Sequence, residues 1–307
     1  MVHPGAHTAI VTVIPISEAT QMSQLDPFPS GSYAGLAADD LGQSDDRPPL
    51  VLLHGLTFDR RMWRPALTEL ARIDPGRRIL SLDLPGHGES PESGPYAMTA
   101  VVERVHSAIT AAHLEAPVIV GHSIAAGTAT VGAAMHPNRG VIAVEGTFRV
   151  GPFAAMAQSL EPMLRGAAFA DTWSRITANV FRLDEVSPEV RDFVLATSQP
   201  RQEVVLGYWR DLFERSPQEL DALVEMGTGA IRASGLPFVA VVGADPSPAD
   251  VAWVRANLPD ARTEVWPRSG HFPHLAHPRR FAELLAETGT WVSPPVAAAP
   301  TRGRSEG

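Results

Sequence analysis

The chain has 307 residues, enough for one large α/β domain with an inserted subdomain or for two domains. It is 44% hydrophobic, carries a formal net charge of −9 and has no cysteine, which excludes disulfides, thiolate catalysis and cysteine-based metal sites. The acidic balance gives no basic surface for nucleic acid or an anionic membrane. The sequence shows no secretory signal pattern and no apolar run near ~20 residues, so we expect a cytoplasmic location.

Short apolar runs rich in β-branched residues alternate with amphipathic segments through the first half of the chain. Strands are predicted at residues 9–16, 33–41, 50–53, 79–83, 117–120 and 140–144. Helices are predicted at residues 65–73 and 99–113, and from the turn after residue 122 to about residue 136. This alternation favours an α/β fold with a mostly parallel central sheet flanked by helices and an active edge at the carboxyl ends of the strands.

The pattern changes after residue 146. From residue 147 to about residue 234 no strand-like run occurs, and the segment is helical in pattern and rich in Met, Phe and Trp. Strands are predicted again at 236–243 and 262–266, with helices at 248–257 and 279–288. We therefore expect a core made of residues 1–146 and 236–292, an inserted helical lid at 147–235 and a disordered tail at 293–307.

The stretch 116–127 carries the strongest chemical signal. A buried strand leads into Gly-His-Ser-Ile-Ala at 121–125, and small residues suited to a helix packed tightly on a sheet follow. A strand, a sharp turn with Ser123 at its tip and a helix are the context of a nucleophile elbow. The turn needs small residues around the serine. Gly121 is one of them, whereas Ala125 stands where the usual pattern has a second glycine.

Three further motifs occur at fitting places: Leu-His-Gly at 53–55, Asp-Leu-Pro-Gly-His-Gly-Glu-Ser at 83–90 and Ser-Gly-His-Phe-Pro-His at 269–274. Together with residues 121–125, these motifs resemble those of α/β-hydrolase-fold serine hydrolases of the small esterase, lactonase and perhydrolase kind, and in the same order. The resemblance covers about residues 48–290. It implies the α/β-hydrolase fold and an acyl-serine mechanism that uses no metal or other cofactor.

The resemblance also assigns roles to individual residues. Ser123 is implied to be the nucleophile and His271 the base that removes its proton, in the chain order nucleophile, acid, histidine. The backbone N–H groups of Leu56 and Ile124 are implied to form the oxyanion hole. Four other motif residues are interpreted as residues that pack or hold loops near the site: Asp83, His54, His87 and His122.

The acid of the triad has two candidates. Most relatives carry an Asp in the loop that comes after the first strand following the inserted region, and its common spacing is Gly-x-x-Asp. In this sequence Asp245 lies only two residues after Gly243, which is one residue short of that spacing. Some hydrolases of this fold place a Glu at the end of the strand after the elbow helix, and Glu145 ends that strand here. Glu145 is preferred and Asp245 is the alternative. Either carboxylate would orient His271 and stabilise its imidazolium form.

The lid residues Trp173, Phe153, Met156 and Trp209 are candidates to line a substrate pocket, and packing between lid helices is the competing explanation. A lid this apolar favours a hydrophobic small-molecule substrate. The sequence thus predicts hydrolysis of a carboxylic ester or lactone, with no nucleic-acid or membrane partner and with the oligomeric state undefined. The alternatives are a carbon–carbon bond hydrolase or perhydrolase of the same fold, and a non-catalytic ligand-binding protein on this scaffold.

Overall fold

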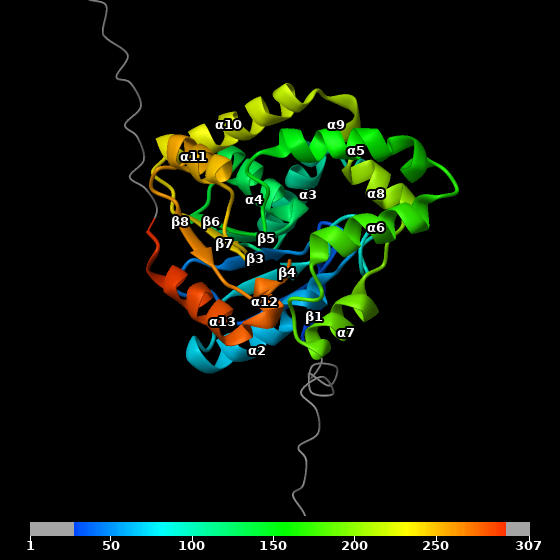
Figure 1. Ribbon diagram of the computed structural model, residues 1–307. Helices are drawn as coiled ribbons and strands as arrows, with labels where there is room; N and C mark the ends of the chain where they lie inside the picture. The colour runs from blue at the N-terminus through cyan, green and yellow to red at the C-terminus, as the bar shows by residue number, and fades with distance from the viewer. Residues whose placement is uncertain (1–27, 293–307) are drawn as a thin grey trace, which may run out of the picture.

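The computed structural model describes residues 28–292, which form an eight-stranded sheet with helices on both faces (Figure 1). The strand order is β1-β2-β4-β3-β5-β6-β7-β8. Strand β2 is antiparallel to both of its neighbours, and the other strand pairs are parallel. The expected mostly parallel sheet is therefore confirmed. The strand predicted at 9–16 and the disordered tail predicted at 293–307 lie outside the described residues.

The five central strands are buried along almost their whole length. A parallel sheet covered on both faces requires this, and it explains why these strands read as nearly continuous apolar runs. The strand bounds are β1 Ser30–Tyr33, β2 Leu36–Leu41, β3 Leu50–Leu53, β4 Ile79–Leu82, β5 Val118–His122, β6 Gly140–Val144, β7 Phe238–Val242 and β8 Arg262–Val265.

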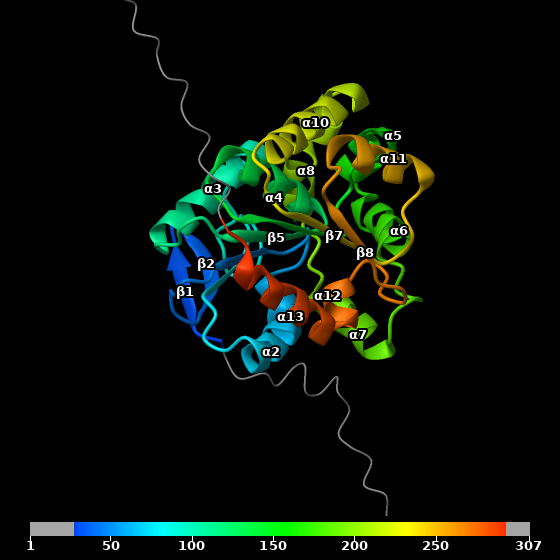
Figure 2. The same ribbon diagram turned by 90° about the vertical axis from the view of Figure 1, so that its left-hand side faces the viewer.

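Two layers of helices cover the sheet, and the alternation of side chains along each strand divides the core between them. Leu50 and Leu52 point into the cluster under α2 (Arg64–Ile73) and α13 (Pro278–Glu287). Val51 and Leu53 belong to the cluster on the opposite face. Figure 2 shows the two layers on either side of the sheet. The second layer contains α3 (Met98–Ala111), α4 (Ile124–Met135), α10 (Pro217–Ala233) and α11 (Pro248–Asn257).

The segment between β6 and β7, here called the insert (residues 147–235), is helical throughout its regular structure. Its first long helix, α5, packs against α6, α8 and α9, while α10 runs back along α4 to return the chain to the sheet (Figure 1). The helices before α10 are α5 Val150–Arg165, α6 Phe169–Phe181, α7 Pro188–Thr197, α8 Gln202–Tyr208 and α9 Arg210–Glu214.

The structure differs from the prediction in two segments. The strand predicted at 33–41 is a hairpin, because Ala34 and Gly35 both adopt positive φ and reverse the chain. A two-residue turn of this kind requires positive φ at both central positions. The four-residue helix α12 (Pro273–Ala276) was not predicted, since it is too short to show a helical period.

No helix in the described part of the chain is long and apolar enough to cross a membrane.

Candidate active site

Ser123 lies at the tip of the turn between β5 and α4. Its φ of 57° is in the left-handed region, a strained conformation for a non-glycine residue that often marks a functional site. A Cβ atom on Gly121 would lie 2.1 Å from the carbonyl oxygen of Ala125, so the turn needs glycine at 121. The methyl group of Ala125 is fully buried and accommodated. The departure from the usual second glycine therefore leaves the turn intact.

The loop after β3 touches this turn. A Cβ atom on Gly55 would lie 3.3 Å from Cβ of Ser123 and 2.7 Å from Nδ1 of His122, so only glycine lets the two backbones approach. Leu56, the next residue, is therefore carried to the neighbourhood of the serine. Ile124 is the first residue of α4, where the backbone N–H has no acceptor within the helix. The two amides suggested for the oxyanion hole thus both belong to segments that meet at Ser123.

Two buried histidines tie the loops around the turn together. His54 Nε2 accepts a hydrogen bond from the backbone N–H of Leu84 at 2.9 Å. His87 Nε2 accepts one from the backbone N–H of Thr57 at 3.1 Å, and its Nδ1 lies 3.0 Å from the carbonyl of Pro85. Burial lowers the pKa of both rings, to about 3 for His87, which keeps them neutral at pH 7. These contacts agree with the interpretation of both residues as loop-packing histidines.

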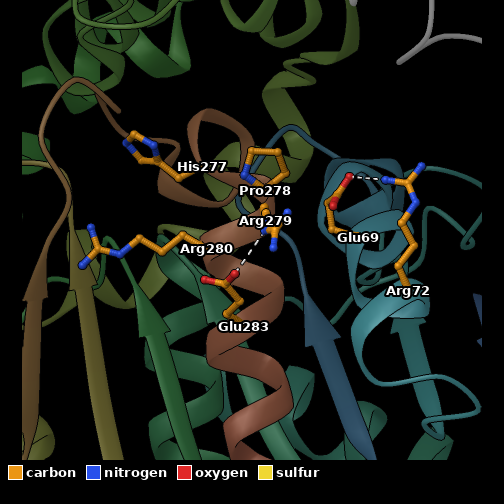
Figure 3. A pocket seen from close by; sticks show the side chains of 7 residues that line it. All are labelled: Glu69, Arg72, His277, Pro278, Arg279, Arg280 and Glu283. Atoms are coloured by element: carbon orange, nitrogen blue, oxygen red, sulfur yellow. Dashed lines mark hydrogen bonds and ion pairs between the residues drawn. The ribbon is translucent and has the colours of Figure 1, made fainter.

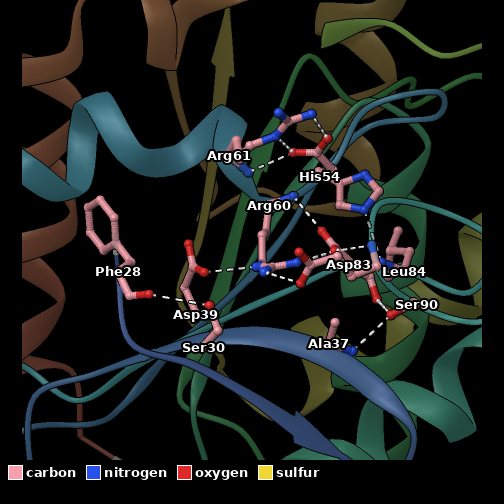
Figure 4. A network of polar contacts seen from close by, with 12 residues as sticks. Phe28, Ser30, Ala37, Asp39, His54, Arg60, Arg61, Asp83, Leu84 and Ser90 are labelled. Carbon is pink, nitrogen blue, oxygen red and sulfur yellow. Dashed lines mark hydrogen bonds and ion pairs between the residues drawn. The ribbon is translucent and has the colours of Figure 1, made fainter. Parts of the chain in front are cut away.

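The loop that begins at Asp83 is held by a buried ion network (Figure 4). Asp83 Oδ1 accepts a hydrogen bond from the backbone N–H of Arg60 at 2.8 Å, and its Oδ2 accepts one from the backbone N–H of Glu89 at 2.8 Å and pairs with the Arg60 guanidinium. Asp39 on β2 binds Arg60 at 2.8 Å and Arg64 at 2.9 Å. The two fully buried carboxylates are thus each paired with arginine, as buried charges must be. Asp83 holds this loop, in agreement with its interpretation.

Glu145 and His271 are brought together, although they are 126 residues apart in the chain. His271 Nδ1 lies 3.0 Å from Oε2 of Glu145. Glu145 directly follows β6, has a φ of 51° and also accepts a hydrogen bond from the backbone N–H of Gly243. Burial acts to raise the pKa of Glu145, but the hydrogen bond from His271, the Gly243 amide and the charge of Arg182 outweigh it and lower the pKa. Glu145 is therefore a carboxylate at neutral pH.

Asp245, the other candidate acid, lies in the loop after β7, two residues beyond Gly243, and is exposed. The residue of that loop nearest to the pair is Gly243, where a Cβ atom would lie only 2.2 Å from the carbonyl oxygen of Gly270. The loop therefore contributes a backbone amide to Glu145 rather than a second carboxylate to His271. Of the two candidates, the structure brings Glu145 alone to the imidazole.

The other ring nitrogen of His271 is available. His271 Nε2 is buried and has no hydrogen-bond partner among the described residues. The backbone of His271 is held on both sides: its N–H donates to the carbonyl of Phe181 at 3.0 Å, and its carbonyl oxygen lies 2.8 Å from Nε2 of His122. Burial holds the pKa of His122 well below its usual value, so that ring is neutral and donates from Nε2. Nδ1 of His271 points to the acid, and Nε2 is left for a substrate or nucleophile.

Sequence reasoning missed the part played by the end of α6. Phe181 binds the backbone of His271, and the next residue, Arg182, places Nη2 2.7 Å from the carbonyl oxygen of Gly270 and 3.3 Å from Oε2 of Glu145. No motif or spacing in the insert marks these residues, because the contacts form only when the folded insert meets the loop after β8. The unusual local feature is the left-handed φ of Arg182, and this feature is visible in the structure but not in the sequence.

Three of the four lid residues suggested for a pocket, Phe153, Trp173 and Trp209, form part of an aromatic cluster inside the insert. The rings of Trp173 and Trp209 lie 5.3 Å apart, and Phe153 contacts Trp209 at the same centroid distance of 5.3 Å. Both tryptophans are buried, whereas Phe153 and Met156 are half-buried. The tryptophans belong to the same apolar cluster as Leu56, so the packing between insert helices is continuous with the surroundings of the oxyanion-hole candidates.

A separate surface hollow of about 730 Å³ lies between α2 and α13 (Figure 3). Arg72 pairs with Glu69 and Arg279 with Glu283, so its charges are largely compensated. None of the residues around Ser123 lines it. Within residues 28–292, no three His, Asp or Glu side chains are grouped closely enough to bind a metal ion.

Comparison with known proteins agrees with this architecture. The family model described as "Alpha/beta hydrolase family" matches residues 50–284. A 2-succinyl-6-hydroxy-2,4-cyclohexadiene-1-carboxylate synthase from Serratia proteamaculans is 26% identical over 81% of this chain and 96% of its own. A pimeloyl-(acyl-carrier protein) methyl ester esterase from Edwardsiella ictaluri is 27% identical over 78% of this chain and 92% of its own. The solved structure of an esterase from Exiguobacterium antarcticum superimposes with a TM-score of 0.65 at 16% identity, covering 83% of this chain and 95% of the other.

The sheet order, the flanking helices and these structural neighbours define the α/β-hydrolase fold, which confirms the predicted fold class. Because the family model matches 235 of the 307 residues (50 to 284), the chain belongs to the alpha/beta hydrolase family.

Proposed function

We propose that this protein is a serine hydrolase that cleaves a carboxylic ester or lactone of a hydrophobic small molecule. In this proposal Ser123 is the nucleophile, His271 the general base and Glu145 the acid that orients it. The observation that carries the proposal is the pair Glu145–His271, joined at 3.0 Å, in which Nε2 of the imidazole has no partner among residues 28–292. A relative named as a methyl ester esterase supports an ester as the bond that is cleaved.

The chemistry proceeds in two halves. In the first, Nε2 of His271 takes the hydroxyl proton while Oγ of Ser123 bonds to the carbonyl carbon, and the tetrahedral intermediate expels the alcohol, which receives that proton. In the second, His271 deprotonates a water that attacks the acyl-serine, Oγ of Ser123 leaves and takes that proton from His271, and the carboxylic acid product is released. The N–H groups of Leu56 and Ile124 are proposed to bind the oxyanion in both halves, and one such donor is worth about 10²–10³ in rate.

The insert is proposed to act as a lid that forms the substrate's acyl-binding surface. Its helices join the sheet between β6 and β7, and its apolar cluster includes Leu56 beside the proposed oxyanion hole. An apolar surface at this place favours a substrate whose acyl or alcohol part is hydrophobic. Phe153 and Met156, which are half-buried, are the better candidates for direct contact. Trp173 and Trp209 are proposed to support them from within the cluster.

A fluorophosphonate probe tests the nucleophile directly. We expect the wild-type protein to gain the mass of one phosphonyl group, because the activated hydroxyl displaces fluoride from phosphorus. Ser123→Ala should gain none, and the matched control Ser159→Ala, at an exposed serine of the insert, should label like wild type. Labelling of Ser123→Ala at the wild-type rate would contradict the proposed mechanism.

A further inference from the structure

The end of α6 is attached to the loop that carries His271. A Cβ atom on Gly270 would lie 2.6 Å from the carbonyl oxygen of Phe181 and 2.7 Å from that of Arg182, so the two backbones are in direct contact. The N–H of His271 also donates to the carbonyl of Phe181 at 3.0 Å. The contact between residues 181–182 and residues 270–271 is here called the α6 corner. At this corner the insert contacts the backbone of His271 directly and helps to hold it in place.

Arg182 connects this corner to the acid through one nitrogen. Its Nη2 atom binds the carbonyl oxygen of Gly270 at 2.7 Å and Oε2 of Glu145 at 3.3 Å. Oε2 is the same oxygen that contacts Nδ1 of His271. A single guanidinium nitrogen thus joins the acid to the residue immediately before the base, and so restricts their separation and relative orientation.

The backbone at Arg182 supports a specific role. Its φ of 47° and ψ of 51° are left-handed at the C-cap of α6, a position that glycine or asparagine usually occupies. Other L-residues have an unfavourable steric contact in this conformation. A strained residue is kept where the surrounding structure holds it, and such residues gather at functional sites. Here the strained conformation is the one from which the side chain reaches Glu145.

We propose that Arg182 is a positioning residue for the acid–histidine pair: it orients Glu145 toward His271 and keeps the carboxylate charged. The proposal rests on the catalytic roles proposed above for Glu145 and His271. It adds to them a requirement that the insert supply one cation to the dyad. The protein would then be active only when the α6 corner is seated against the loop after β8.

The groups that face Glu145 come from three segments. His271 faces it from the loop after β8, Arg182 from the end of α6, and the uncharged amide of Gly243 from the loop after β7. Glu185 faces Arg182 from the turn beyond α6, with 3.4 Å between the charged atoms. Removing the charge of Arg182 raises the free energy of the Glu145 carboxylate relative to its protonated form, so the protonated, inactive form of the dyad is favoured. The acidic limb of the pH–activity profile therefore moves to higher pH.

The test compares three variants at one helix: Arg182→Gln, Arg182→Lys and the control Arg175→Gln, which removes a charge from an exposed residue of α6. Activity on a short p-nitrophenyl ester is measured from pH 5 to 9 with melting temperatures. We expect Arg182→Gln to lower kcat by about 10- to 100-fold through misplacement of the dyad, with little change in KM. Its acidic limb should move up by about one pH unit or more. Because one nitrogen makes both contacts, Arg182→Lys should restore the limb.

A second readout does not depend on turnover. In protein labelled with ¹³C at glutamate carboxyl carbons, the Glu145 signal, assigned by its loss in Glu145→Gln, should begin to protonate at higher pH in Arg182→Gln than in wild type or Arg175→Gln. An unchanged Glu145 titration and an unchanged acidic limb in Arg182→Gln would overturn the proposal, even if kcat or stability fell. If wild type showed no Ser123-dependent activity, the proposed function would fail, and the carboxyl titration would still decide whether Arg182 controls Glu145.

Discussion

The turn at Ser123 and the insert approach the same site in different ways. The turn is built from neighbours in sequence: Gly121, Ser123 and Ala125 form it, and close backbone packing fixes its shape. The insert contacts the Glu145–His271 pair through two consecutive residues, Phe181 and Arg182, and its apolar side chains join the cluster on one face of the sheet. The difference indicates that Ser123 is positioned by local chain geometry, whereas His271 is positioned by contacts between distant segments.

The largest effects are expected at Ser123, in the local turn, and at His271, which distant segments position. Ser123→Ala and His271→Ala should each reduce kcat by about 10⁶, since removal of a nucleophile or base from a triad has a cost of that size. The measurement is hydrolysis of a short-chain p-nitrophenyl ester by protein with a wild-type melting temperature. More than a few per cent of residual activity in either variant would contradict the role assigned to that residue.

The next effect separates the two carboxylates. Glu145→Gln should slow turnover by up to about 10⁴ while the fold persists, because an amide cannot stabilise the imidazolium or select its tautomer. Asp245→Asn should cost less than about tenfold, because Asp245 is exposed. The ranking is measured on variants with matched melting temperatures. If Asp245→Asn were the worse variant by an order of magnitude, the acid would lie in the loop after β7.

The buried ion network beside the turn should control stability rather than chemistry. Asp39→Asn leaves Arg60 and Arg64 without their shared carboxylate, and breaking a buried pair costs about 3–5 kcal/mol of unfolding free energy. Urea unfolding measures this loss. The matched control is Glu69→Gln, which breaks a more exposed pair with Arg72 and should cost less than about 1 kcal/mol. Equal losses of unfolding free energy in the two variants would show that the buried network stabilises the fold no more than an exposed ion pair does.

The smallest effect is expected in the aromatic cluster of the insert. Trp209→Phe should raise KM for a long-chain acyl ester more than for an acetyl ester, by about tenfold or less, since remote groups position large substrates and touch small ones little. The ratio of kcat/KM for decanoyl and acetyl esters measures this preference. An unchanged ratio with a lower melting temperature would assign Trp209 to packing between insert helices alone.

The sequence was sufficient wherever the signal is local. Buried strands read as apolar runs, so β6 was predicted with its observed bounds, and the helix at 248–257 was predicted with its own because Ser247 and Pro248 mark its start. The hairpin at 34–35 was missed because Ala34 is not a typical residue for positive φ. Arg182 was missed for another reason. Its partners, Glu145 and Gly270, are 37 and 88 residues away, and only the folded insert brings them within reach.

The chain order of the dyad restricts how this protein could be recombined with its relatives. Ser123 and Glu145 both precede the insert and directly follow the neighbouring strands β5 and β6. His271 follows the insert and is held by it at Phe181 and Arg182. A chimaera that exchanges residues 147–235 would therefore need a donor segment that presents a carbonyl and a cation at the same corner. An exchange of insert segments that retains Phe181 and Arg182 would keep their contacts with Gly270 and His271.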